Sequence, residues 1–251
     1  MRIKSEADKR RLYLIKTLTS KDENVNLYTL DISINEDDIN FIKETLELYK
    51  AKYPKCGFKI DYNTSVIQKS KNISKISTYI NNLSADKFER YVALLIKIFG
   101  FEITYATKAS HDQGIDFVGV KKFQLFDSTR KSYLIGQAKK YNSLVDVNEV
   151  RGFSGAVMLL RSREFSQNKD VYKNIFMKSF TPVEGLFATS YFFSPPALKL
   201  CDNADIISLD FIDLVLLTEK AILEKTLEIE TNDLFINKKV DLALNKIDIL
   251  Q

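Results

Sequence analysis

The sequence lacks tryptophan and has only one histidine, two cysteines and four prolines in 251 residues. Two cysteines, Cys56 and Cys201, cannot form the disulfide framework of a small secreted domain and are more typical of a reducing compartment. Because His111 is the single imidazole, a zinc site built from cysteine and histidine is excluded as well. A serine hydrolase triad would depend on this one histidine. Disulfide-rich, zinc-finger and most triad-type proteins are therefore poor interpretations of this sequence.

Long hydrophobic runs are also missing. The longest apolar runs, such as Phe211–Leu217, are far shorter than the roughly 20 residues that span a bilayer. The N-terminal residues lack the apolar core followed by small residues that marks a signal peptide. We therefore expect a cytoplasmic protein with no membrane association. The net charge of +4 permits a nucleic-acid partner but does not by itself argue for one.

Glycine is scarce outside the middle of the chain, because seven of the eight glycines lie between Gly100 and Gly185. Since glycine interrupts helices, the flanking regions are predicted to be mainly helical. We divide the sequence into an α-rich N-terminal domain at 1–82, a central domain at 83–217 and a helical tail at 218–251. Within the first domain, alternating residues 26–34 predict a strand, and the polar residues 63–82 predict a linker or an irregular segment that leads into the next domain.

The central domain shows alternating helix and strand signals. Ser84 is a suitable N-cap, and apolar residues from Phe88 to Phe99 recur at helical spacing until Gly100 ends the helix. Further strands are predicted at 101–107, 114–120, 132–140, 185–190 and 205–209, and further helices at 147–163, 194–204 and 210–230. Three consecutive strands followed by alternation predict an α/β fold with a mixed sheet flanked by helices. The polar residues 164–183 predict a long loop, which is a candidate for substrate contact.

Four residues of the central domain carry the chemistry that we expect, namely Glu89, Asp116, Gln137 and Lys139. Gln137 and Lys139 are two residues apart on a predicted strand and therefore point to the same face. Asp116 lies on the preceding strand, which a short connection would place alongside. Glu89 lies on the helix before the sheet and can reach the same face if that helix packs on the sheet. The set would bring two carboxylates, an amide oxygen and an ammonium group around one point.

This set suits the hydrolysis of a phosphodiester bond. Mg²⁺ prefers oxygen ligands and keeps several waters, so Asp116 is the expected principal ligand, with Gln137 and Glu89 completing the metal site. The metal would lower the pKa of a bound water and stabilise charge on the phosphate oxygens. Lys139 would orient or deprotonate the attacking water, or neutralise the phosphate in the transition state.

Several segments of the chain resemble a known nuclease family. They read FERYVALLIKIFGFEITYATKASHDQGIDFVGV, LIGQAKKY, VNEVRGFSGAV, LFATSYFFSPPALKLC and IISLD. They are similar to the Mrr-type branch of the PD-(D/E)xK nuclease superfamily, which has the restriction-endonuclease fold, over about Leu83–Leu217. The helical glutamate, the motif aspartate and the Q-x-K of the family fall on Glu89, Asp116, Gln137 and Lys139. Gln113 departs from the family pattern, which often has glycine there. The resemblance implies a metal-dependent DNA endonuclease.

Each of the four residues also has a structural interpretation. Glu89 could pair with Arg90 or Lys97 on a solvated helix face. Asp116 and Lys139 could form a structural salt bridge, since a carboxylate within a buried strand is costly unless it is paired or metal-bound. Gln137 could serve only as a cross-strand hydrogen-bonding residue.

Residues outside this set are weaker candidates. Asp112 could bind a second metal, although a hydrogen bond within its turn is the simpler interpretation. His111 could act as a general base, but its loop position favours an exposed histidine or a phosphate contact. Thr189 and Ser190, at a strand end, could touch a phosphate or cap the next turn.

The sequence thus predicts a Mg²⁺-dependent DNA endonuclease of restriction or defence type, acting as a homodimer. The N-terminal domain is the expected site of target recognition and the C-terminal tail the expected site of dimerisation. Three alternatives stay open: a non-catalytic DNA-binding module with the same fold, a nuclease specific for branched or damaged DNA, and a defence nuclease activated by a nucleotide ligand.

Overall fold

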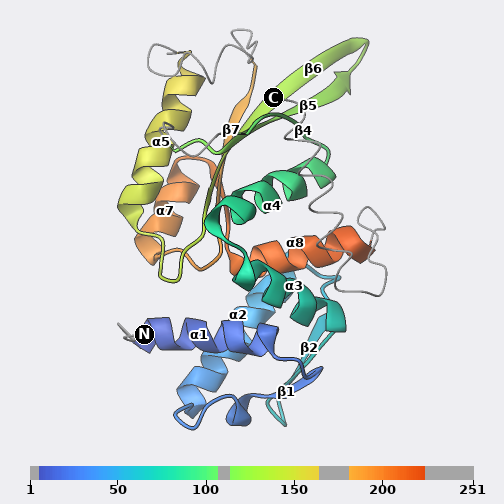
Figure 1. Ribbon diagram of the computed structural model, residues 1–251, viewed down its shortest axis with the longest axis vertical. Coiled ribbons are helices and arrows are strands. Elements are labelled where there is room, and N and C mark those ends of the chain that lie inside the picture. Colours follow the sequence, from blue (N-terminus) through green and yellow to red (C-terminus); the bar gives the residue numbers. More distant parts are fainter. Residues whose placement is uncertain (1–5, 107–113, 164–180, 224–251) are drawn as a thin grey trace. The chain divides into compact units, whose positions relative to one another are not determined.

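The computed structural model describes residues 6–106, 114–163 and 181–223, and these divide into two compact units (Figure 1). One unit contains residues 6–83 together with helix α8, Phe211–Leu223. The other contains Ser84–Asp210. None of the helices within these ranges is both long enough and apolar enough to cross a membrane.

The first unit combines helices with a small sheet. Its helices are α1 (Glu6–Thr19), α2 (Glu36–Lys52), α3 (Lys71–Asn82) and α8, with a 3₁₀ helix at Leu27–Thr29. Its antiparallel sheet has the strand order β1 (Asn24–Asn26), β3 (Val66–Lys69), β2 (Phe58–Asp61). Leucine and isoleucine side chains from the helices, such as Leu14, Ile42 and Ile80, are fully or almost fully buried.

The predicted linker at 63–82 is wrong, because these residues form strand β3 and helix α3. The Ser70 side chain accepts a hydrogen bond from the Ile73 backbone and begins α3. Ile73, Ile76 and Ile80 recur at helical spacing and are buried, so a polar composition conceals an amphipathic helix.

The strand predicted over 26–34 is also largely wrong. Only Asn26, the last residue of β1, lies in a strand. Its side chain accepts a hydrogen bond from the Tyr28 backbone N–H at 3.0 Å and begins the 3₁₀ helix. Local capping therefore outweighs the alternating pattern that suggested a longer strand.

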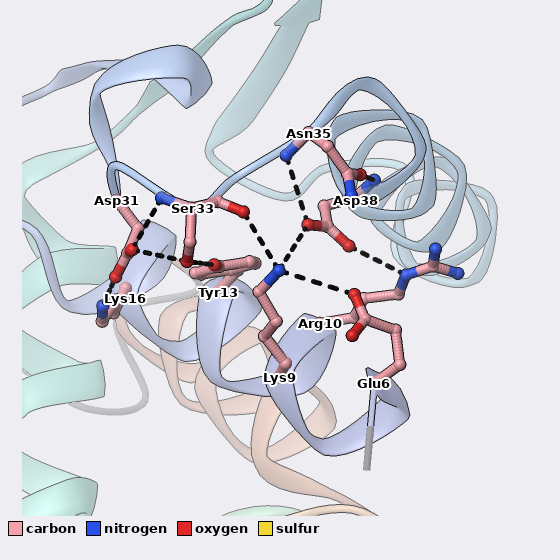
Figure 2. Close-up of polar contacts among 9 residues, drawn as sticks. All are labelled: Glu6, Lys9, Arg10, Tyr13, Lys16, Asp31, Ser33, Asn35 and Asp38. Carbon is pink, nitrogen blue, oxygen red and sulfur yellow. Dashed lines mark hydrogen bonds and ion pairs between the residues drawn. The ribbon is translucent and has the colours of Figure 1, made fainter. Parts of the chain in front are cut away.

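A buried carboxylate joins α1 to α2 (Figure 2). Asp38 is fully buried and forms ion pairs with Lys9 at 3.3 Å and Arg10 at 3.0 Å. It also accepts a hydrogen bond from the Asn35 backbone N–H in a capping box at the start of α2. Burial raises the pKa of Asp38, but the hydrogen bonds from Arg10, Asn35 and Lys9 outweigh burial and hold the pKa below its ordinary value.

Helix α8 belongs to the first unit through two carboxylates. Asp213 accepts hydrogen bonds from Lys52 Nζ at 2.6 Å and from the Tyr53 hydroxyl at 2.9 Å. Glu219, only 1% exposed, accepts from the Gly57 backbone N–H at 2.8 Å and from the Ser70 hydroxyl at 2.6 Å. The sequence placed the first residues of this helix, up to Leu217, in the central domain, whereas these contacts tie the helix to residues about 160 positions earlier. The rest of the predicted tail, residues 224–251, lies outside the described residues.

The second unit confirms the predicted mixed α/β fold. Its strands follow the order β4 (Glu102–Ala106), β5 (Phe117–Leu125), β6 (Ser128–Lys139), β7 (Val183–Thr189), β8 (Ile206–Leu209). The pairs β4–β5 and β5–β6 are antiparallel, and the pairs β6–β7 and β7–β8 are parallel. The helices are α4 (Ala85–Ile98), α5 (Val147–Arg161) and α7 (Pro195–Asn203).

Helices cover both faces of this sheet. One face carries Val118, Ile135 and Phe187, which form a buried cluster with α5 and α7. Helix α4 packs against β4, β5 and β6, and its buried residues do not belong to that cluster, so it covers the other face (Figure 1). Most of the predicted loop at 164–183 lies outside the described residues.

Candidate active site

Asp116 lies directly before β5 and is fixed to the neighbouring strand at two points. Its backbone N–H donates to the Gly136 carbonyl at 2.8 Å, and its carboxylate oxygen Oδ2 accepts from the Ala138 backbone N–H at 2.7 Å. The side chain is half-buried. The carboxylate is therefore held beside the C-terminal end of β6 by the backbone of that strand.

Gln137 and Lys139 lie on the face of the sheet that α5 covers. Strand residues alternate between faces, and Tyr133 and Ile135 of the same strand belong to the cluster on that face. Gln137 is buried, and Lys139 is half-buried at the end of the strand. Asp116 precedes Val118 by two residues and shares this face, so three of the four predicted residues come to the same end of the sheet.

Gly114 makes room for the Gln137 side chain. Its φ of +81° lies in the left-handed region, which residues with a side chain rarely adopt. A Cβ atom at this position would lie 2.6 Å from Nε2 of Gln137. The backbone conformation therefore favours glycine here, and a larger residue would also displace the Gln137 amide.

Tyr141 and Glu149 join the site and were not predicted from the sequence. The Tyr141 hydroxyl donates to Glu149 Oε2 at 2.5 Å, which links the second residue after β6 to the first turn of α5. Burial, this hydrogen bond to Glu149 and the nearby negative charge of Asp116 raise the pKa of Tyr141 above its ordinary value. The family resemblance could have indicated them, because Tyr141 lies in the segment LIGQAKKY and Glu149 in the segment VNEVRGFSGAV.

Ser190 and Thr189 brace the chain that carries Tyr141. The Ser190 hydroxyl donates to the Tyr141 carbonyl and accepts from the Tyr141 backbone N–H, each at 3.0 Å. Thr189 is buried, and its hydroxyl accepts from the Tyr191 backbone N–H. The Thr189 contact fits the interpretation that this residue caps the next turn, whereas the Ser190 contacts fix the end of β6 to the end of β7.

Glu89 comes from α4, which covers the opposite face of the sheet. It lies near the N-terminal end of this helix and is half-buried. The neighbouring Phe88 and Val92 supply the fully buried side of the helix. The participation of Glu89 in the site stays a prediction, and it would require the carboxylate to approach around the end of the sheet.

The remaining candidates, His111 and Asp112, lie outside the described residues. Arg161, the last residue of α5, donates to the carbonyls of Val183 and Ala204, at 2.9 and 3.0 Å, so it supports the fold.

The donors at this end of the sheet are oxygen atoms, which suits a hard cation such as Mg²⁺ better than a soft one. Asp116 offers a carboxylate and Gln137 a neutral amide oxygen. Within the described ranges, no group of three or more histidine, cysteine, aspartate and glutamate side chains gathers in metal-binding geometry. A cation held by Asp116 and Gln137 would keep several waters, as Mg²⁺ does.

The mixed sheet with helices on both faces is an α/β fold that brings Asp116, Gln137 and Lys139 to one end of the sheet. Residues 80–166 match the Mrr_cat family model, whose description is restriction endonuclease. The matched stretch contains Glu89 and Asp116 as well as Gln137, Lys139 and Tyr141, and it confirms the resemblance inferred from the residues over this part of the chain. No curated protein matches the chain.

Several solved structures with some similarity to this chain are restriction endonucleases. MspJI in complex with an oligonucleotide has 15% identity and a TM-score of 0.43, covering 60% of this chain and 32% of that chain. The modification-dependent enzyme AspBHI has 20% identity and a TM-score of 0.38, covering 64% and 35%. FokI bound to DNA has 12% identity and a TM-score of 0.40, covering 87% and 45%. The chain therefore spans less than half the length of each of these enzymes.

Proposed function

We propose that the protein is a Mg²⁺-dependent endonuclease that hydrolyses DNA phosphodiester bonds in restriction or another defence role. The observation that carries this proposal is the attachment of Asp116 to the β6 backbone beside Gln137 and Lys139. The family match over 80–166 supports the same reaction class. We further propose that the enzyme acts in the cytoplasm as a homodimer that cuts both strands.

The residues of the site have distinct roles in this proposal. Asp116 and Gln137 hold the cation, and Glu89 adds a second carboxylate from α4. When bound, Mg²⁺ supplies an activated water and stabilises charge on the phosphate oxygens. Lys139 places its ammonium group against the scissile phosphate, whose negative charge increases as water adds to phosphorus and the bond to the leaving oxygen breaks.

Tyr141 and Glu149 act as positioning residues in this proposal. Their hydrogen bond ties the residue after Lys140 to α5, and Ser190 fixes the same residue to β7. The chain that carries Lys139 is therefore held between two elements. This restraint keeps the ammonium group at one place relative to Asp116, which is the type of preorganisation that phosphoryl chemistry requires.

The test is cleavage of supercoiled plasmid, methylated and unmethylated, with Mg²⁺ or with EDTA. Asp116→Asn is the informative variant, because its amide oxygen can still accept from Ala138 while the negative charge is lost. Asp202→Ala is the matched control, since Asp202 is an exposed acid on α7 of the same unit. We expect metal-dependent nicking or linearisation that Asp116→Asn abolishes and Asp202→Ala retains.

Folded wild-type protein that binds DNA but cleaves neither plasmid would contradict the proposal. It would favour the non-catalytic DNA-binding module, for which the neutral Gln137 in place of a carboxylate is the specific argument. Cleavage that appears only with branched DNA, or only after a nucleotide is added, would instead identify one of the two other nuclease types.

A further inference from the structure

Strands β5 and β6 continue past the other strands of their sheet (Figure 1). Strand β4 pairs with β5 only at residues 117–120, and β7 pairs with β6 only at residues 133–139. Beyond these limits the two strands pair with each other, from Lys121 opposite Ser132 to Leu125 opposite Ser128. We call residues 121–132 the basic ribbon. Within the described ranges, its backbone ladder has no third strand.

The ribbon is rich in positive charge. It carries the basic residues Lys121, Lys122, Arg130 and Lys131 and the single acid Asp127. Lys122 and Lys131 lie directly opposite each other across the two strands, an arrangement of like charges that destabilises a sheet. Lys122 is partly compensated by an ion pair with Glu102 at 3.0 Å. The excess of positive charge on the ribbon therefore lowers the stability of the folded state.

The tip of the ribbon exposes apolar side chains. Phe126 is 94% exposed, and Phe123 and Leu125 are also exposed. Phe126 occupies the turn with a φ of +51°, which is unusual for a bulky side chain. Among the described residues, this phenylalanine adds almost nothing to a core, and its left-handed conformation strains the turn, which points to a binding role.

We propose that the basic ribbon binds double-stranded DNA, with the Phe126 tip in a groove and the basic side chains on the phosphates. The proposal deepens the proposed function, since it names a substrate-binding surface of the same enzyme. A two-stranded ribbon fits the major groove, which is about 12 Å wide. Apolar side chains inserted at base steps are a known means of gripping duplex DNA. A second copy of this chain is disfavoured as the occupant, because pairing two ribbons would oppose their positive charges.

The ribbon lies far from the candidate active site along the sheet. Phe126 lies ten residues after Asp116, and at about 3.4 Å per residue the tip is about 34 Å away along the strand. This distance corresponds to about ten base pairs of B-form DNA. The enzyme would therefore contact DNA about one helical turn from the bond that it cleaves.

The first test compares two double variants with the same loss of charge. Arg130→Gln with Lys131→Gln alters the ribbon, whereas Lys97→Gln with Lys199→Gln alters exposed lysines on α4 and α7. Binding to a fluorescent 30-base-pair duplex is measured in EDTA, which prevents cleavage, across a salt series. Because the ribbon variant would neutralise two fewer phosphates, we expect its slope of log affinity against log salt to be shallower by about 1.8, with no change for the other variant. Equal slopes for the two variants would overturn the proposal.

The second test addresses the tip. Phe126→Ser keeps the charge, so we expect weaker binding with an unchanged salt slope, and a melting temperature no lower than wild type. The stretch of DNA that Phe126→Ser protects in a footprinting experiment should be shorter than with wild type, on the side away from the cut, because the tip contacts the DNA there. The proposal would be overturned if Phe126→Ser bound DNA with wild-type affinity. If the substitution instead changed the sedimentation coefficient of the protein, the result would favour contact of the tip with a second copy of the chain.

Failure of this proposal can be separated from failure of the proposed function. If the Asp116 variant lost cleavage while the ribbon variants kept both cleavage and DNA affinity, only the proposed role of the ribbon would be rejected. Binding that depends on the ribbon in a protein that cleaves no DNA would reject the nuclease alone. Both assays use the full chain, with circular dichroism confirming that each variant folds.

Discussion

The Asp116 carboxylate accepts a hydrogen bond at 2.7 Å from the backbone N–H of Ala138, the residue between Gln137 and Lys139. One strand thus supplies both the backbone donor that orients the carboxylate and the two side chains beside it. The candidate metal ligand and the candidate cationic group are therefore coupled through a single peptide segment.

This coupling separates the effects of two substitutions. We expect Asp116→Ala to lower stability by about 1–3 kcal/mol, because it leaves the Ala138 N–H without its acceptor. Asp116→Asn keeps an acceptor and should lose less stability, while both variants lose cleavage. Urea unfolding and plasmid cleavage provide the two measurements. A fully active Asp116→Asn would reject the metal-ligand role of this residue.

Gly114→Ala should lower cleavage activity. A methyl group at this position would displace the Gln137 amide and would also strain a left-handed backbone. Gly152→Ala is the matched control, because Gly152 is an exposed residue of α5 with open space around it. Alanine there should raise stability by about 0.5–1 kcal/mol. Equal cleavage by the two variants would show that the position of Gln137 is not important.

Gly57→Ala should destabilise the first unit. A Cβ atom at Gly57 would overlap Oε1 of Glu219, the carboxylate that accepts from the Gly57 backbone and from Ser70. The expected loss is about 1–3 kcal/mol, as for other overpacked sites. Thermal unfolding measures this loss of stability. In a separate hydrogen-exchange experiment, the backbone amides of α8 and α3 should exchange faster than in wild type, while those of β5 and β6 should be unchanged. Unchanged protection of α8 would contradict the structural role of Glu219.

Asp38 should stabilise the first unit in a pH-dependent manner. Its folded-state pKa lies below the unfolded value of about 3.9, so the unfolded chain takes up the proton first as the pH falls. The stabilisation is therefore fully present above about pH 4 and is lost as the pH falls through the folded-state pKa. Asp38→Asn should be less stable at pH 7, by about 3 kcal/mol, and the difference from wild type should narrow at pH 3. A difference that is constant with pH would contradict this assignment.

The central part of the fold could be predicted because its signals are local. Strand alternation alone places Gln137 and Lys139 on one face, and Ser84 with the following apolar residues defines α4 closely. The family match over 80–166 confirms the resemblance in the same region. The roles of the four site residues stay predictions, because they depend on contacts with a metal and with DNA.

Other features could not be predicted because they depend on distant contacts or on capping. Helix α3 was not predicted, because most of its residues are polar and only the isoleucines between them are buried. The contact between Tyr141 and Glu149 requires α5 to return to the end of β6, which no local pattern specifies. The extent of the β5–β6 hairpin was underestimated, because residues 121–132 are polar and lack the apolar alternation of a half-buried strand.

The position of α8 has a consequence for synthesis on the ribosome. Residues 6–83 bury Glu219 and Asp213 of a helix that is translated more than 120 residues later, so the first unit cannot complete its core early. The second unit, Ser84–Asp210, is translated in full before that helix emerges. Although domains usually fold in the order of their synthesis, the second unit here can fold first. It is inserted in the sequence between the two segments of the first unit, which completes its core only after α8 has been translated.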